Sequence, residues 1–477
     1  MKKILTIVLL ICAINFMFAQ SNKYKIDVTL KGFSNTTAIL AVHGGETKYA
    51  VDSVVLDQNG KGSFSKPRDL EGGMYFLAVD GAALFDFLVS ADGSEFFEII
   101  ADKANDFSKI EFVNSPENTV WMTYLEYCTQ HQAKSGQLVQ KYSESPENSD
   151  EQKELRKQLL SFNSPLIEYS DSLAKQYKGK VLATIVKALS PREEPDLFLP
   201  EDEPDRERKM AINYYLFNKE HFFDNIDFSD ERLLRTPFFM PLIFDYYFKN
   251  VIIFREADTI ISCIDNVMNR IPEGSKMYRF LLSHLFNFYQ RSTVMGHEAI
   301  PIHLGENYYL TPKVTWETEK FEKDLVDFIL KNKPTLIGNI SPDLMLPTLD
   351  GKRYESIHRL TANYIVLFFY DIDCGHCKEE VPHVKEIYDK YKNELELEVY
   401  AVYTMTNEQK WRDFIEQHKL DWINVWDPNR TADIYNTFNT VTTPQIYVLD
   451  KDKKVIARRL DTANLDKLLQ LILAENK

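Results

Sequence analysis

Apolar and polar positions alternate over short runs in the first part of the chain. The segment "YKIDVTL" at 24–30 is one such run, and Asn59 and Gly60 stand between two others. A period of two is typical of strands that bury one face, and an Asn-Gly pair favours a hairpin turn. Residues 20–115 are therefore predicted to form a β-sandwich domain.

Residues 116–335 show the spacing of amphipathic helices instead. Apolar side chains recur every three or four positions in "DEQKELRKQLL" at 150–160 and in "FEKDLVDFILKN" at 321–332. Such a recurrence places the apolar side chains on one face of a helix. This region is predicted to form an all-α domain.

From residue 336 to residue 477 the pattern changes to that of a small α/β domain. "YIVLFFY" at 364–370 is a continuous apolar run, as expected of a strand in a sheet that is covered on both faces. Thr406 and Gln409 have the capping-box spacing of a helix start. Later in the chain, "PQIYVLD" is predicted to pair with "VIARRL" as a hairpin. The predicted fold class is a multidomain chain with an N-terminal β-sandwich, a central all-α domain and a C-terminal α/β domain.

Residues 1–19 have the layout of a secretory signal peptide. Lys2 and Lys3 precede an apolar run that begins at Ile4, and Ala19 provides a small residue near the expected cleavage site. An uncleaved membrane anchor is the alternative interpretation. The predicted location is the periplasm or the cell envelope.

Charge narrows the possible functions only a little. The formal net charge is −15. Nucleic-acid affinity depends on lysines and arginines that neutralise phosphates, so a nucleic-acid partner is not expected.

The cysteine content is more informative. Apart from Cys12 in the predicted signal, the chain contains Cys128, Cys263, Cys374 and Cys377, too few for a disulfide-stapled scaffold. Cys128 and Cys263 stand in apolar, helix-like surroundings and are predicted to be inert core thiols. Only a glycine and a histidine separate Cys374 from Cys377, which indicates a pair kept for its reactivity.

This Cys-Gly-His-Cys segment is predicted to begin a helix. The unpaired N–H groups and the dipole of a helix N-terminus stabilise a thiolate, and cysteines so placed have pKa values of ~3.5–7.5. Cys374, at the exposed edge, is predicted to attack a disulfide and form a mixed disulfide. Cys377, one turn deeper, is predicted to resolve it.

Two alternatives for the cysteine pair stay open: a zinc site and a purely structural disulfide. Structural zinc sites usually draw ligands from a second, distant pair, and the sequence has no such pair. His297, Glu298 and His303 lack the spacing that places two imidazoles on one helical face, so they are interpreted as structural. No metal or other cofactor is predicted.

Three neighbours of the pair are candidate site residues. A His376 imidazolium is predicted to stabilise the Cys374 thiolate and so to tune the redox pair. Glu380 follows Cys377 by one helical turn, where its carboxylate can take the proton of the resolving cysteine. Pro444 precedes a buried strand and is predicted to stand in a cis-proline loop that pairs with an extended peptide.

Three segments resemble the extracytoplasmic thioredoxin-like proteins of the TlpA/ResA type, within the AhpC/TSA and thioredoxin superfamily. They are "GNISPDLMLPTLDGKRYES", "YIVLFFYDIDCGHCKEEVPHVKEIYDKY" and "VTTPQIYVLDKDKKVIARR", all within 336–477. The resemblance implies a thioredoxin fold, with Cys374 as nucleophile, Cys377 as resolving cysteine and Glu380 as the acidic residue. It places the cis-proline at Pro444, with Thr443 before it, as the substrate-binding loop.

Two positions depart from the pattern of this superfamily. The TlpA/ResA proteins usually have tryptophan just before the first cysteine, where this chain has Asp373. A carboxylate there opposes thiolate formation, so Asp373 and His376 are predicted to tune the pair in opposite directions. Thioredoxin's buried aspartate is replaced by Phe368.

The regions before the pair also resemble known families. "VDSVVLDQNGKGSFSKPRDLEGGMYFLAV" is similar to β-rich N-terminal domains of Bacteroides-type bacteria, and "HFFDNIDFSDERLLRTPFF" is similar to an uncharacterised helical domain found beside them. These resemblances assign no chemistry to either region.

The resulting hypothesis is an extracytoplasmic thiol–disulfide oxidoreductase of undetermined direction. It would act on cysteine-containing envelope proteins and exchange electrons with a membrane thiol–disulfide partner. The competing hypothesis is an envelope binding protein in which the thioredoxin domain is a scaffold or a structural-disulfide module.

Overall fold

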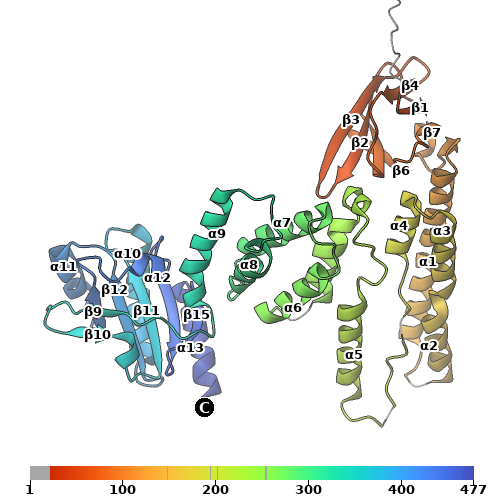
Figure 1. The fold of residues 1–477 in the computed structure, drawn as a ribbon. Coiled ribbons are helices and arrows are strands. Elements are labelled where there is room, and N and C mark those ends of the chain that lie inside the picture. The colour runs from red at the N-terminus through yellow and green to blue at the C-terminus, as the bar shows by residue number, and fades with distance from the viewer. Residues whose placement is uncertain (1–21, 148, 194, 201, 253–254, 477) are drawn as a thin grey trace, which may run out of the picture. The chain divides into compact units, whose positions relative to one another are not determined.

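The computed structural model describes residues 22–147, 149–193, 195–200, 202–252 and 255–476 (Figure 1). The predicted signal at 1–19, with Cys12, lies outside the described residues. Contacts divide the chain into two compact units, 1–253 and 254–477. No helix among the described residues is both long enough and apolar enough to cross a bilayer.

The first unit begins with two β-sheets that enclose one core. Their strand orders are β4-β1-β7-β8 and β3-β2-β5-β6. Ile26 and Val28 of one sheet and Leu40 and Leu77 of the other are fully buried in the same apolar cluster, so the sheets face each other as a sandwich. The strands are β1 Tyr24–Lys31, β2 Thr37–Gly44, β3 Thr47–Val55, β4 Lys61–Lys66, β5 Gly73–Val79, β6 Ala82–Val89, β7 Phe96–Asp102 and β8 Glu111–Val113.

The turn at Asn59 and Gly60 is present, but the predicted hairpin is wrong. β3 pairs with β2, whereas β4 pairs with β1 in the other sheet, so the turn carries the chain from one sheet to the other. A Cβ at Gly60 would lie 2.1 Å from the Leu30 carbonyl oxygen, and its φ is +73°, so glycine is required here. An Asn-Gly pair specifies the local turn, whereas the pairing partner is a tertiary choice.

Helices complete the first unit. Asn118, in the first turn of α1, exchanges hydrogen bonds with both backbone groups of Leu88 on β6, at 2.7 and 3.0 Å. These bonds fasten the helical region to the sandwich. The elements are α1 Pro116–Glu144, α2 Asp150–Phe162, α3 Ser164–Gln176, α4 Val181–Leu189, α5 Arg206–His221, the 3-10 helices η1 Lys103–Asn105 and η2 Glu231–Arg235, and the π-helix η3 Pro241–Val251.

The second unit begins with helices and continues into an α/β domain. Its first elements are α6 Ala257–Met268, α7 Lys276–Gln290, α8 Ala299–Leu304, the π-helix η4 Gly305–Tyr309, α9 Glu319–Asn332 and the 3-10 helix η5 Lys333–Thr335. The α/β domain comprises β9 Met345–Pro347, β10 Tyr354–Ser356, η6 Ile357–Arg359, β11 Tyr364–Tyr370, α10 Gly375–Tyr391, β12 Leu397–Tyr403, α11 Glu408–His418, β13 Ile423–Trp426, α12 Ile434–Thr437, β14 Gln445–Asp450, β15 Val455–Arg458 and α13 Thr462–Glu475.

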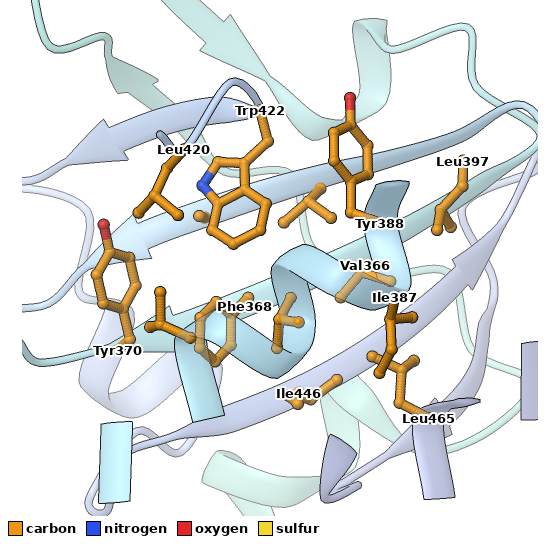
Figure 2. Close-up of a cluster of buried hydrophobic side chains, with 14 of the residues drawn as sticks. Val366, Phe368, Tyr370, Ile387, Tyr388, Leu397, Leu420, Trp422, Ile446 and Leu465 are labelled. Atoms are coloured by element: carbon orange, nitrogen blue, oxygen red, sulfur yellow. The ribbon is translucent and has the colours of Figure 1, made fainter. Parts of the chain in front are cut away.

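The central sheet of this α/β domain has the strand order β13-β12-β11-β14-β15. β11, β12 and β13 run parallel, and β14 and β15 form the predicted antiparallel hairpin. Val366, Phe368 and Tyr370 of β11 pack into a cluster with α10, α11 and α13, part of which is drawn in Figure 2. Their neighbours Ile365 and Leu367 enter a second buried cluster on the opposite face. A strand buried on both faces explains the continuous apolar run of the sequence.

The capping-box prediction at Thr406 and Gln409 is wrong by one residue. Asn407 is the N-cap of α11, and its side chain accepts a hydrogen bond from the Lys410 N–H at 3.2 Å. Asparagine caps helices at least as well as threonine. This register also places Trp411 in the core, where it is fully buried.

Candidate redox site

The cysteine pair lies where β11 gives way to α10. Cys374 is the N-cap residue of α10, and Cys377 lies in the first turn of that helix. The connecting loop is fixed by backbone contacts, because the Cys374 N–H donates to the Asp371 carbonyl at 3.2 Å. The Asp373 N–H donates to the Asp371 side chain at 2.9 Å. The local sequence therefore places both sulfurs at a helix N-terminus, as predicted from their spacing.

The two thiols have opposite environments. Cys374 is partly exposed and Cys377 is fully buried. The backbone N–H of Cys377, with a smaller contribution from that of His376, lowers the pKa of Cys374. Burial raises the pKa of Cys377 to about 11. Of the two thiols, the exposed one is therefore the one whose ionised, nucleophilic form is favoured.

This asymmetry predicts a pH dependence for alkylation of Cys374. Its rate should rise with pH and level off above the lowered pKa, so half of the maximal rate is expected below the ~8.5 of a free cysteine. The measurement is the rate of iodoacetamide labelling against pH in a Cys377→Ser variant, which keeps the backbone N–H groups, read by mass spectrometry of the Cys374 peptide. A midpoint at or above the value for free cysteine would contradict the stabilised thiolate.

The loop before β14 lies against the exposed cysteine. The Thr443–Pro444 peptide bond is cis, as expected from the sequence. The Cys374 thiol donates to the Thr443 carbonyl, with 3.5 Å between sulfur and oxygen. The structure thus brings together the cysteine pair and the loop predicted to bind substrate, which are 69 residues apart in the chain.

A groove of about 590 Å³, called here the redox groove, opens beside this loop. It is lined by His376, Glu380, Asn439, Val441, Thr442, Pro444, Gln445, Ile446, Arg459, Leu460 and Asp461. His376 and Glu380 of α10 thus share the groove with Pro444. A carboxylate oxygen of Glu380 accepts a hydrogen bond from the Thr462 N–H at 3.3 Å.

Asp373 is not among the residues that line this groove. It lies 3.4 Å from the ammonium group of Lys410, and both side chains are more than half exposed. The lysine opposes the charge that was expected to disfavour the thiolate.

Sequence reasoning missed Asn439 and Arg459. No spacing rule links either residue to the cysteines, and neither stands in the helix that follows them. Both residues reach the groove because the loop after α12 and the end of β15 meet there.

The other two described cysteines belong to other helices, α1 and α6. Cys263 is fully buried in α6, as predicted, whereas Cys128 in α1 is only partly buried and so is not the core thiol that was expected; burial still raises its pKa. Across the described residues, no three His, Cys, Asp or Glu side chains cluster in a way that could hold a metal ion.

The sheet order and a cysteine pair at the start of the helix after its central strand define a thioredoxin-like domain. Residues 337–458 match the AhpC/TSA family, and this C-terminal domain is a member of it. Residues 207–332 match a domain of unknown function, DUF5106. The predicted family resemblance, including the uncharacterised helical domain, and the predicted fold class are confirmed.

Curated relatives share the C-terminal domain. The chain is 27% identical over 129 residues to thiol-disulfide oxidoreductase ResA of Bacillus thuringiensis subsp. konkukian, covering 27% of this chain and 72% of the relative. It is 28% identical over 131 residues to ResA of a Bacillus cereus strain, covering 28% and 73%. The domain is thus homologous to thiol–disulfide oxidoreductases of the ResA type, which agrees with the predicted enzyme class.

Solved structures are also similar to this chain. A domain of a possible thiol-disulfide isomerase from Cytophaga hutchinsonii is 34% identical, with coverage of 30% of this chain and 97% of that domain and a TM-score of 0.28. A thioredoxin-like protein from Bacteroides caccae is 19% identical, with coverage of 57% and 96% and a TM-score of 0.43.

Proposed function

We propose that this protein exchanges disulfides with cysteine-containing proteins of the cell envelope, through a mixed disulfide on Cys374. The observation that carries the proposal is the asymmetry of the pair: Cys374 is accessible and has a lowered pKa, whereas Cys377 is buried and has a raised pKa. An attacking thiol must be ionised and reachable, and a resolving thiol must be protected until it is needed.

In the reducing direction, the Cys374 thiolate attacks one sulfur of a substrate disulfide. The substrate S–S bond breaks, one substrate thiolate leaves, and a new S–S bond joins the substrate to Cys374. The Cys377 thiolate then attacks Cys374, the mixed disulfide breaks, and the second substrate thiolate leaves. Two electrons have passed from the pair to the substrate, and the reverse sequence oxidises a substrate dithiol.

The second step requires that Cys377 lose its proton despite a pKa of about 11. Glu380 is the proposed acceptor of that proton, since it lies one turn further along α10 and faces the redox groove. His376 and Asp373 are proposed to tune the pair. Thr443 and Pro444 are the proposed contacts for the substrate backbone.

Export and domain organisation belong to the same proposal. Residues 1–19 direct export, residues 20–115 form the β-sandwich domain, and 116–335 form the helical domain. Residues 336–477 carry the chemistry outside the cytoplasm. A second exchange, with a membrane thiol–disulfide partner, then returns the Cys374–Cys377 pair to its starting redox state. Both exchanges transfer electrons between sulfur atoms, so neither needs a separate cofactor.

A Cys377→Ser variant is expected to accumulate covalent complexes with envelope proteins. Without the resolving thiol, the mixed disulfide on Cys374 persists until an external thiol breaks it. The measurement is non-reducing electrophoresis of acid-quenched envelope extracts, with mass spectrometry of bands that dithiothreitol removes.

The matched control is Cys377→Ser combined with Cys374→Ser, which should trap nothing. Complexes that persist in the double variant would exclude Cys374 as their attachment point. Absence of complexes in the single variant would favour the envelope binding protein over the oxidoreductase.

A further inference from the structure

Asn332, the last residue of α9, is a polar side chain in a buried position. Only 2% of it is exposed. Its side-chain N–H group donates to the Phe328 carbonyl at 2.8 Å, one turn back along the same helix. This bond fixes the orientation of the amide, so its oxygen is the atom available to other groups.

That single oxygen accepts hydrogen bonds from two residues that line the redox groove. The Asn439 side-chain nitrogen lies 3.0 Å from it, and the guanidinium of Arg459 lies 2.9 Å from it. Asn439 belongs to the segment that leads to Thr443 and Pro444, whereas Arg459 directly follows β15. The buried Asn332 side-chain oxygen therefore holds two residues that line the groove on separate segments.

Neighbouring groups make this arrangement rigid. The buried guanidinium of Arg458 donates to the Asn332 and Thr335 carbonyls, each at 3.2 Å. A Glu298 carboxylate oxygen lies 3.7 Å from Arg458 and 3.8 Å from Arg459. One carboxylate thus faces two guanidinium groups, and the Asn332 oxygen accepts a hydrogen bond from each of them, at 3.3 Å from Arg458 and 2.9 Å from Arg459.

Asn439 is constrained at its backbone as well. Its φ is +48°, in the left-handed region that asparagine tolerates better than most residues. The carbonyl of Phe438, its predecessor, accepts a hydrogen bond from the Tyr447 hydroxyl at 2.6 Å. With its side chain held by Asn332, this residue fixes the start of the loop that reaches Cys374.

We propose that Asn332 is a positioning residue for substrate binding, which holds Asn439 and Arg459 as the walls of the redox groove. The inference rests on the proposed thiol–disulfide exchange and adds a residue of the helical region to it. Both Asn332 and Arg459 lie outside the 337–458 segment that matches the AhpC/TSA family. Helix α9 is then part of the redox machinery.

The test compares insulin, a protein disulfide, with bis(hydroxyethyl) disulfide, a probe too small to span the groove, in steady-state reduction by the full chain. Asn332→Leu has a similar volume but no acceptor oxygen. We expect its KM for insulin to rise roughly tenfold, with kcat nearly unchanged, because the oxygen that accepts hydrogen bonds from Asn439, Arg458 and Arg459 is lost. Its rate with the small disulfide and the pH midpoint of Cys374 alkylation should match the wild type.

Three further single variants and one double variant extend the test. Asn332→Asp keeps an oxygen that faces both guanidinium groups but loses the N–H that donates to the Phe328 carbonyl, so its KM should lie between those of Asn332→Leu and the wild type. Asn439→Gly tolerates the same backbone conformation but lacks the side chain. In the double variant with Asn332→Leu, the fold-increase in KM should be smaller than the product of the two single fold-increases. Asn339→Ala removes only an exposed bond to the Lys333 carbonyl and is the matched control.

The outcomes separate the two proposals. An active wild type with an unchanged KM in Asn332→Leu overturns the positioning role alone, as does an equal loss with both disulfides. A wild type that reduces neither disulfide overturns the proposed function and this inference together.

Discussion

Replacement of Cys374 by serine is expected to lower disulfide reduction by roughly three orders of magnitude or more, to the background rate. A hydroxyl at this position is neither ionised near neutral pH nor able to form a disulfide, so the first step of the exchange is lost. The measurement is steady-state insulin reduction with dithiothreitol as electron donor.

The loss should occur without unfolding. Cys374 is the N-cap of α10, and its side chain makes no capping hydrogen bond. Serine is among the best N-cap residues, so native-state hydrogen exchange of the β11 and β12 amides in Cys374→Ser should be as slow as in the wild type or slightly slower. Cys128→Ser removes another incompletely buried thiol, from α1 in the first unit of the chain, and should keep its activity within about twofold. Retained activity in Cys374→Ser would refute its assignment as the nucleophile.

Replacement of Phe368 by alanine is expected to destabilise the α/β domain by about 3–5 kcal/mol. Phe368 is fully buried at the centre of β11. Its ring is stacked on Tyr370, with 5.2 Å between centroids, and meets Trp422 edge-on at 6.5 Å (Figure 2). Removal of the ring leaves a cavity between the sheet and α10, which the rigid neighbours cannot fill.

Because the chain contains more than one compact unit, a single unfolding midpoint would not isolate this effect. The measurement is native-state hydrogen exchange of the β11 and β12 amides in the full chain. Their free energy of opening should fall by the stated amount. Leu471→Ala, at a side chain that is 63% exposed on α13 of the same domain, should change it by no more than about 0.5 kcal/mol. Equal protection in Phe368→Ala and the wild type would show that this core is not the source of stability.

The sequence predicted those parts of the architecture that depend on the pattern of neighbouring residues. The continuous run from Tyr364 to Tyr370 indicated a strand covered on both faces, because each successive side chain needed an apolar partner. The spacing of Cys374 and Cys377 placed both thiols at a helix start, since the first helical turn lies next to the loop that precedes it. Pro444 was predicted as a cis-proline from its position before a buried strand.

Some local patterns predicted a turn or a helix start but did not predict which strands would pair or at which residue the helix would begin. Asn59 and Gly60 form a turn, but the strands that flank it belong to different sheets. Hydrogen-bond pairing between strands depends on which strands are neighbours, and residues far apart in the chain decide that. In α11, the burial of Trp411 accompanies a helix start at Asn407 and not at Thr406.

The sequence by itself determined the class of domain and the place of its cysteine pair, because two cysteines at the start of a helix are encoded by neighbouring residues. Only the tertiary structure decided what surrounds that pair. The pKa of Cys377 is raised because the folded core excludes water from it, and Asn439 and Arg459 line one groove and each donate a hydrogen bond to Asn332, more than 100 residues away along the chain. Burial and convergence of distant segments exist only after the chain has folded, so no short pattern of residues can encode them.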